Sequence, residues 1–143
     1  MKPNKLLYFF SLLFALTVFS SCDKDDSEPT KTDILTSHEW KGSRVLVAGL
    51  DVSDRPEIKD MLLDIKTLRL NFNRNGSYTA TYTDKSGPRT TTGAWQFTNN
   101  ETKLAFDLLG EMEIKNFTSS NLDMIKVAQN GSLTYNAEVQ LIK

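Results

Sequence analysis

The chain has 143 residues, of which 39% are hydrophobic and 24% charged, so it suits one globular domain and is too apolar for a disordered protein. Its formal net charge of −1 argues against a nucleic-acid-binding protein, which needs a basic face to displace counterions from phosphates. A single histidine and a single cysteine exclude a metal site built on those ligands.

The first 21 residues have the three parts of a secretory signal peptide. Two lysines give a basic start, an uncharged apolar run of 14 residues extends over Leu6–Phe19, and two serines precede Cys22. A permanent membrane-spanning helix needs about 20 apolar residues, so this run is short for that role. We therefore expect residues 1–21 to be cleaved off. The remaining chain carries 15 basic and 18 acidic side chains, a net charge of −3.

Cys22 is the only cysteine, and its position indicates attachment of lipid. The segment Phe19-Ser20-Ser21-Cys22 resembles the bacterial lipobox, in which a hydrophobic residue and two small residues precede the cysteine. The resemblance implies a diacylglyceryl group on the sulfur and a further fatty acid, such as palmitate, on the new amino terminus. Each buried methylene contributes about 0.8 kcal/mol, so two or three acyl chains together hold a protein on a membrane.

The residues after Cys22 form an acidic segment. Lys24, Asp25 and Asp26 resemble the surface-export signal of Bacteroidota lipoproteins, which implies a location on the outer membrane, facing the cell surface. The alternative interpretation is a solvated polar linker, which is what acidic runs usually are. We predict that residues 22–33 are the lipidated cysteine and a flexible acidic linker, followed by a domain that spans 34–143.

Within this domain, short β-type runs alternate with turn residues. Leu68, Leu70 and Phe72 alternate with polar neighbours, and this period of two is typical of a strand. Turn dipeptides such as Asn75-Gly76, whose residues adopt positive φ in tight hairpins, separate the runs. The predicted strands are Glu39–Val47, Leu68–Asn73, Tyr78–Thr83, Trp95–Phe97, Leu104–Leu108, Met112–Ile114, Leu122–Met124 and Leu133–Leu141.

These eight strands follow one another through short links, which predicts an antiparallel meander. A meander of this kind leaves two exposed edges, and closure into a barrel removes them. We therefore expect an all-β, about eight-stranded, antiparallel up-and-down barrel. An open two-sheet sandwich is the alternative that the same alternation would suit.

One amphipathic helix is expected between the first two strands. Asp54 and Glu57 form a candidate capping box, and Pro56 lies in the first turn, where its missing N–H costs little. The apolar stripe of this helix either closes one end of the barrel permanently or forms a movable lid over a ligand cavity, and we favour the permanent plug. The stripe consists of Ile58, Met61, Leu62 and Ile65.

Several motifs together carry a resemblance: Leu35-x4-Trp40, Leu68–Phe72 with the Asn75-Gly76 turn and Tyr78, Gly93-x-Trp95, and Ile114-x2-Phe117-Thr118 before Leu122. They resemble the lipocalin-like lipoprotein domains of Bacteroidota over residues 32–143. The resemblance implies an up-and-down barrel and a small hydrophobic ligand. It departs from true lipocalins at the first strand, where their glycine lies two residues before the tryptophan, whereas here Gly42 follows Trp40.

The aromatic residues are the candidate ligand contacts. A small eight-stranded barrel either fills with side chains or holds one small ligand, and each buried aromatic takes up about 150–250 Å². A filled barrel would favour the alternative function, a non-enzymatic module for interaction with proteins at the cell surface or a structural role. The candidates for the interior are Trp40, Phe72, Tyr78, Tyr82, Trp95, Phe97, Phe106 and Tyr135.

No enzymatic activity and no cofactor are expected. His38 is the only histidine, and no glycine-framed nucleophile accompanies it. Asp107, Glu111 and Glu113 are the acidic residues whose convergence the sequence leaves open, although we expect them on solvent-facing strands or turns.

Overall fold

A computed structural model describes residues 27–143, apart from the side chain of Asn130. The predicted signal peptide, Cys22 and the predicted export signal Lys24, Asp25 and Asp26 lie outside the described residues. Among the described residues, the helices are all too short and too polar to cross a membrane.

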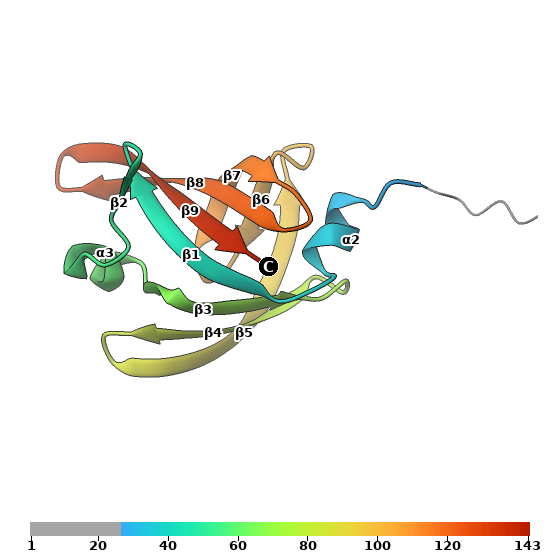
Figure 1. The fold of residues 1–143 in the computed structure, drawn as a ribbon, viewed down its shortest axis with the longest axis horizontal. Coiled ribbons are helices and arrows are strands. Elements are labelled where there is room, and N and C mark those ends of the chain that lie inside the picture. Colours follow the sequence, from blue (N-terminus) through green and yellow to red (C-terminus); the bar gives the residue numbers. More distant parts are fainter. Residues whose placement is uncertain (1–26) are drawn as a thin grey trace, which may run out of the picture.

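Eight strands form a closed antiparallel barrel (Figure 1). Each strand pairs with the next along the chain, except that β1 pairs with β3, and β1 also pairs with β9 and so closes the ring. The prediction of an eight-stranded up-and-down barrel is confirmed, and the open sandwich is excluded by this closure. The barrel strands are β1 (Trp40–Val47), β3 (Asp64–Phe72), β4 (Ser77–Asp84), β5 (Gly87–Thr98), β6 (Lys103–Phe106), β7 (Gly110–Phe117), β8 (Asn121–Asn130) and β9 (Leu133–Ile142).

A ninth strand, β2 (Leu50–Asp51), was not predicted from the sequence. It forms a two-residue hairpin with the end of β1, in which Val47 pairs with Leu50. Both residues of the turn have positive φ, 50° at Ala48 and 80° at Gly49, as a tight turn of this length requires. Only Gly49 gives a sequence signal for this turn, because alanine rarely adopts a left-handed conformation.

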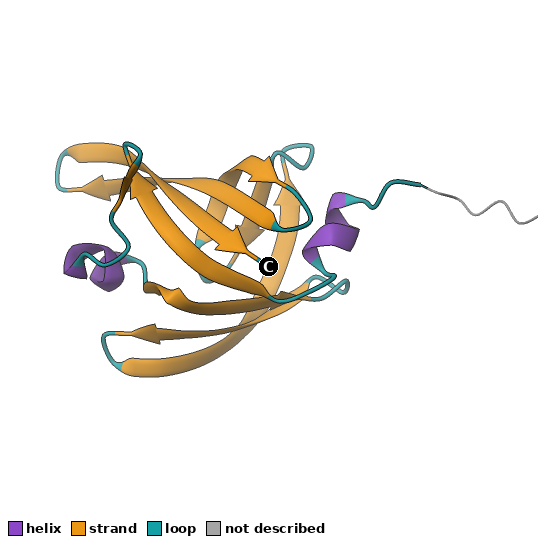
Figure 2. Ribbon diagram, in the orientation of Figure 1, coloured by secondary structure: helices purple, strands orange, loops and turns teal. Residues whose placement is uncertain are grey.

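Two short helices lie at opposite ends of the barrel (Figures 1 and 2). The first, α2 (Lys31–Leu35), begins with a capping box in which Thr30 and Asp33 bond to each other's backbone N–H. Asp33 also pairs with Arg74, in the turn between β3 and β4. The Thr30 hydroxyl and backbone N–H, together with Arg74, lower the pKa of Asp33 to about 2. The predicted linker over 22–33 is therefore too long, because its last three residues belong to this helix.

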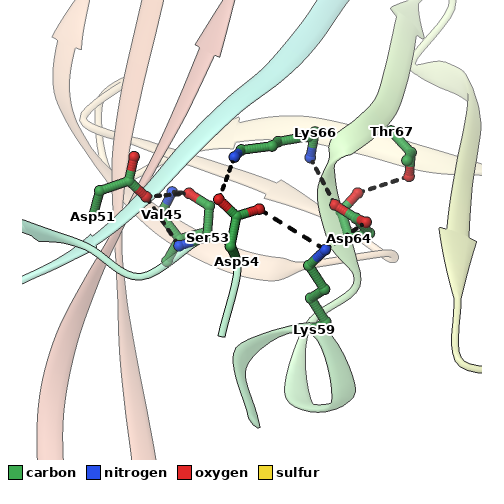
Figure 3. Close-up of polar contacts among 8 residues, drawn as sticks. All are labelled: Val45, Asp51, Ser53, Asp54, Lys59, Asp64, Lys66 and Thr67. Carbon is green, nitrogen blue, oxygen red and sulfur yellow. Dashed lines mark hydrogen bonds and ion pairs between the residues drawn. The ribbon is translucent and has the colours of Figure 1, made fainter. Parts of the chain in front are cut away.

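The second helix, α3 (Pro56–Met61), is shorter than predicted. Its N-cap is Arg55, which makes no side-chain capping bond, so the predicted capping box of Asp54 and Glu57 is wrong. The Asp54 carboxylate instead lies 2.6 Å from Lys66 Nζ and 4.0 Å from Lys59 Nζ (Figure 3). Asp54 therefore lies outside the helix and pairs with Lys66 near the start of β3.

Polar contacts hold the segment between β2 and α3 against β1 (Figure 3). The Ser53 side chain is only 1% exposed, and its Oγ accepts a hydrogen bond from Val45 N at 2.9 Å and donates to Asp51 Oδ1 at 2.6 Å. These donors from Ser53 lower the pKa of Asp51. The backbone N–H of Val45 thereby has a hydrogen-bond acceptor. The same bond ties the segment before α3 to β1.

Alternate residues of each strand fill the barrel interior, as the period of two predicts. Within this wall, Gly42 of β1 lies directly against the backbone of β3. A β-carbon built at this position would lie 1.8 Å from the Ile65 carbonyl oxygen and 3.0 Å from Leu68 Cβ, so only glycine fits. The glycine that follows Trp40 thus has a packing role between β1 and β3.

The variant Gly42→Ala is expected to lower the free energy of unfolding by about 2–3 kcal/mol or more, because the methyl group meets backbone that cannot move aside cheaply. The matched control is Gly131→Ala in the β8–β9 turn, where nothing lies within 4 Å of an added β-carbon and only the positive φ of 61° opposes the change. Urea denaturation of both variants measures the difference. Equal losses would contradict the close contact at Gly42.

Candidate ligand-binding site

Four of the predicted ligand contacts pack against one another inside the barrel, beside the turn between β3 and β4. Phe72 lies 5.7 Å from Trp95 and 5.5 Å from Phe106, measured between ring centroids, and both pairs are edge-to-face. Tyr78 contacts Phe106 in the same way at 5.6 Å. All four are buried, and their burial raises the pKa of Tyr78. Edge-to-face packing of this kind stabilises a core, so these rings have one another as partners rather than a ligand.

Two further predicted contacts lie toward α2 and close that end of the barrel. Trp40 is fully buried, and its indole Nε1 donates to the Leu35 carbonyl at 2.9 Å, which ties the first strand to the helix. Phe97 is half-buried and continues the aromatic packing, 5.6 Å from Trp95 and 6.3 Å from Phe117. These contacts make the α2 end a packed floor.

His38 is part of this floor. Its ring lies 4.4 Å from the Trp40 ring, and its Nδ1 lies 2.7 Å from Ser37 Oγ. Burial and, to a smaller extent, the charge of Lys143 lower the pKa of His38. The half-buried imidazole packs on the Trp40 ring beside the core, a position that the sequence did not indicate.

The remaining two predicted contacts, Tyr82 and Tyr135, are half-buried and lie toward the α3 end. Tyr135 borders a groove of about 270 Å³, and its hydroxyl lies 3.3 Å from Met61 Sδ. Tyr82, on β4, is not among the groove residues. The groove runs between the end of β1, the segment that leads into α3, α3 itself and β9. Its lining residues are Val47, Val52, Arg55, Glu57, Ile58, Met61 and Tyr135.

The four residues of the predicted helical stripe do not form one stripe. Ile58 is buried in α3 and Leu62 is half-buried just after it, but Met61 is 40% exposed and Ile65 belongs to β3. The helix stops at Met61 because β3 begins three residues later, and β-branched Ile65 is favoured in a strand. Leu63, which is 2% exposed, is a core residue at this end that the helical pattern missed.

The three acidic residues left open by the sequence have separate structural partners or face outward. Asp107 Oδ2 accepts a hydrogen bond from Ala94 N at 2.9 Å, and Glu111 pairs with Lys103 at 2.9 Å. The Lys103 ammonium and the Thr98 hydroxyl lower the pKa of Glu111. Glu113 lies exposed on β7. Within residues 27–143, no group of three or more histidine, cysteine or acidic residues is placed to hold a metal ion.

No protein-family model matches the sequence. No curated protein matches it either. Solved structures of similar fold include a deswapped triple mutant of bovine odorant-binding protein, with 13% identity over 77% of this chain and 74% of that chain and a TM-score of 0.49. The bovine lipocalin allergen Bos d 2 has 13% identity over 74% and 71%, with a TM-score of 0.47. Hamster aphrodisin has 15% identity over 74% and 73%, with a TM-score of 0.45.

Truncation of two adjacent leucines tests which residue closes the α3 end. We expect Leu63→Ala to lower the free energy of unfolding by about 2–5 kcal/mol, as for other leucines removed from packed cores. Leu62→Ala is expected to cost about half as much or less, because its side chain is only partly buried. Denaturant titration of both variants measures the two losses. A larger loss at Leu62 than at Leu63 would show that α3 closes the barrel as the sequence predicted.

Proposed function

We propose that the protein is a lipid-anchored, non-enzymatic binding protein that takes a small hydrophobic ligand at the α3 end of its barrel. The observation that carries this proposal is the groove beside α3, where apolar side chains from three elements meet around open space. The opposite end is filled by the packed floor and the aromatic cluster. Apolar walls with a few polar groups are the usual lining of small-molecule sites.

The size and lining of the groove define what it suits. Its volume of about 270 Å³ is slightly below the range of about 300–1,000 Å³ that is common for ligand pockets. Val47, Val52, Ile58, Met61 and the Tyr135 ring supply apolar surface, whereas Arg55 and Glu57 supply charge at the rim. A short alkyl chain or a single small ring fits this description better than a large polycyclic molecule.

The position of α2 sets how an anchored barrel would be oriented. The chain enters the barrel at α2, and the groove lies at the opposite end, beside α3 (Figure 1). With lipid on Cys22, the floor would lie toward the membrane and the groove would face away from it. We propose an outer-membrane, surface-facing location on the strength of the lipobox and export-signal resemblances.

A protein partner is the second candidate function, because large apolar side chains are exposed near the same end. Leu50 on β2 is 66% exposed and Leu133 at the start of β9 is 71% exposed. Both belong to hairpins at the α3 end of the barrel (Figure 1). Large apolar side chains that stay exposed at one end of a domain are candidates for contact with a partner.

The ligand proposal is tested by placing a charge in the groove. Met61→Glu is expected to abolish binding of a fluorescent medium-chain alkyl probe, because the carboxylate would be desolvated by the ligand. The control is Ile142→Glu at the other end of the barrel, where the side chain is 39% exposed against 40% for Met61. Fluorescence titration measures both variants. Binding that survives Met61→Glu, or that Ile142→Glu weakens equally, would place the ligand elsewhere; absence of binding to the unaltered protein would favour the protein partner.

The anchoring proposal is tested at Cys22. The variant Cys22→Ala is expected to lose incorporation of radiolabelled palmitate and to accumulate as the uncleaved precursor, because lipid attachment precedes cleavage in lipoproteins. A second variant with alanines at Lys24, Asp25 and Asp26 is expected to keep its lipid but to become protected from external protease in intact cells. Labelling of the Cys22 variant would contradict the anchor, and unchanged protease sensitivity of the second variant would contradict the export signal.

A further inference from the structure

His38 lies in the link between α2 and β1. Its imidazole packs on the Trp40 ring, with 4.4 Å between the ring centroids. Trp40 is fully buried, and its indole Nε1 donates to the carbonyl of Leu35, the last residue of α2, at 2.9 Å. His38 therefore contacts the side chain through which β1 holds α2.

The hydrogen bonds of Ser37 determine which nitrogen of His38 carries the proton. Ser37 Oγ lies 2.8 Å from the Ile34 carbonyl oxygen and 2.7 Å from His38 Nδ1. A carbonyl oxygen can only accept, so the single hydroxyl proton goes to Ile34 and the hydroxyl oxygen accepts from Nδ1–H of His38. In the neutral ring, Nε2 is then the nitrogen without a proton.

This Nε2 is buried and has no hydrogen-bond partner among the described residues. A second proton on the imidazole would have to go to Nε2, because Nδ1 already carries one. It would create a charged donor in a buried position that offers no acceptor, which is costly. The closed junction therefore disfavours the protonated form of His38.

The charges around the junction also oppose a positive charge on His38. Burial lowers the pKa of His38 below its ordinary value, and the charge of Lys143, which follows β9, lowers it further. The charged side chains of α2 and of the link have partners of their own, namely Lys31 with the Glu101 carbonyl, Asp33 with Arg74, and Glu39 with Arg69.

We infer that His38 makes the junction between α2 and β1 sensitive to acid, because protonation of Nε2 turns the imidazole out to water, uncovers Trp40 and loosens α2 from the barrel. The open junction binds the proton more tightly than the closed one. The open population therefore rises as the pH falls below about 6.5, and it stops rising below the pKa of the closed form. Neither the groove nor a ligand takes part, so this inference does not rest on the proposed function.

The pH range of this change belongs to His38. Between the pKa values of the open and closed forms, one proton shifts the equilibrium by up to about tenfold per pH unit. The carboxylates of the domain have ordinary pKa values near 4, and the pKa values of Asp33, Asp51, Asp84, Glu111 and Glu138 are lower still, so their effect on stability comes below about pH 5. His38 is the only histidine of the chain.

The test measures hydrogen exchange of the Trp40 indole N–H by NMR, in the chain 22–143 with Cys22→Ala so that no detergent is required. The indole N–H of Trp95, which donates to the Asn73 carbonyl at 2.9 Å, is the internal control. Each rate is divided by that of free tryptophan amide at the same pH, which removes the chemical effect of pH on exchange. From about pH 7.5 to about pH 5, protection of Trp40 is expected to fall about tenfold, whereas that of Trp95 should stay constant.

Two variants remove the titration in different ways. His38→Phe keeps a ring on Trp40, and His38→Asn keeps an N–H donor for Ser37, so at least one of them preserves the packing of the junction. Neither side chain takes up a proton in this range, and the pH dependence of Trp40 protection should vanish in both. Lys143→Met is expected to move the change to higher pH, because loss of the nearby cation raises the pKa of His38.

Three results would overturn the inference. An equal loss of protection at Trp40 and Trp95 would mean that acid unfolds the whole barrel, and constant protection at Trp40 would mean that the junction does not respond. A pH dependence that persists in both His38 variants would assign the change to another group. An NMR titration that gives His38 a pKa at or above its ordinary value near 6.5 would show that attraction of the imidazolium to the Trp40 ring outweighs burial, and the inference would fail.

Discussion

The pairing of β1 with β9 is the constraint on which this structure depends. Without it, the first and last strands would each leave an unpaired edge, and the interior residues would face water. The first strand pairs with β3 along one edge, at Trp40 and Lys41, and with β9 along the other edge, from Lys41 to Val47, where a bulge between Gly42 and Arg44 interrupts the ladder. Gly42 lets β1 pass within contact of Ile65 at this point. The close contact between β1 and β3 at this point therefore depends on a residue without a side chain.

The two ends of the barrel differ because of what covers them. At one end Leu35 and Trp40 share a hydrogen bond inside a continuous aromatic core, so the space is filled. At the other end Ile58 of the short helix α3 joins the core, whereas Met61 stays partly in solvent and borders the groove. The Trp40 indole and its neighbours fill the α2 end, whereas the short helix α3 leaves a groove beside it. The groove lies at the end where packing is incomplete.

The strands were predictable because each shows alternation, and the barrel followed from the shortness of the links between them. The end of the helix could not be predicted in this way. The residues Ile58, Met61, Leu62 and Ile65 match a helical period, but Ile65 already belongs to β3. The pairing of β3 with its neighbouring strands decides the structure at this point, not the helical spacing of the apolar residues. The site was predictable only as a set of aromatics: sequence alone does not distinguish Phe72, which packs in the core, from Tyr135, which borders the groove.

The attachment of α2 has a mechanical consequence. Asp33 pairs with Arg74 in the β3–β4 turn, and Lys31 donates to the Glu101 carbonyl at 2.6 Å in the turn between β5 and β6. A pull on the chain before Thr30 is thus shared between two hairpins before it reaches β1. The strand that closes the barrel would be loaded last. Because both contacts are polar and near the surface, salt would weaken the first of them, and the resistance of the domain to tension would depend on ionic strength.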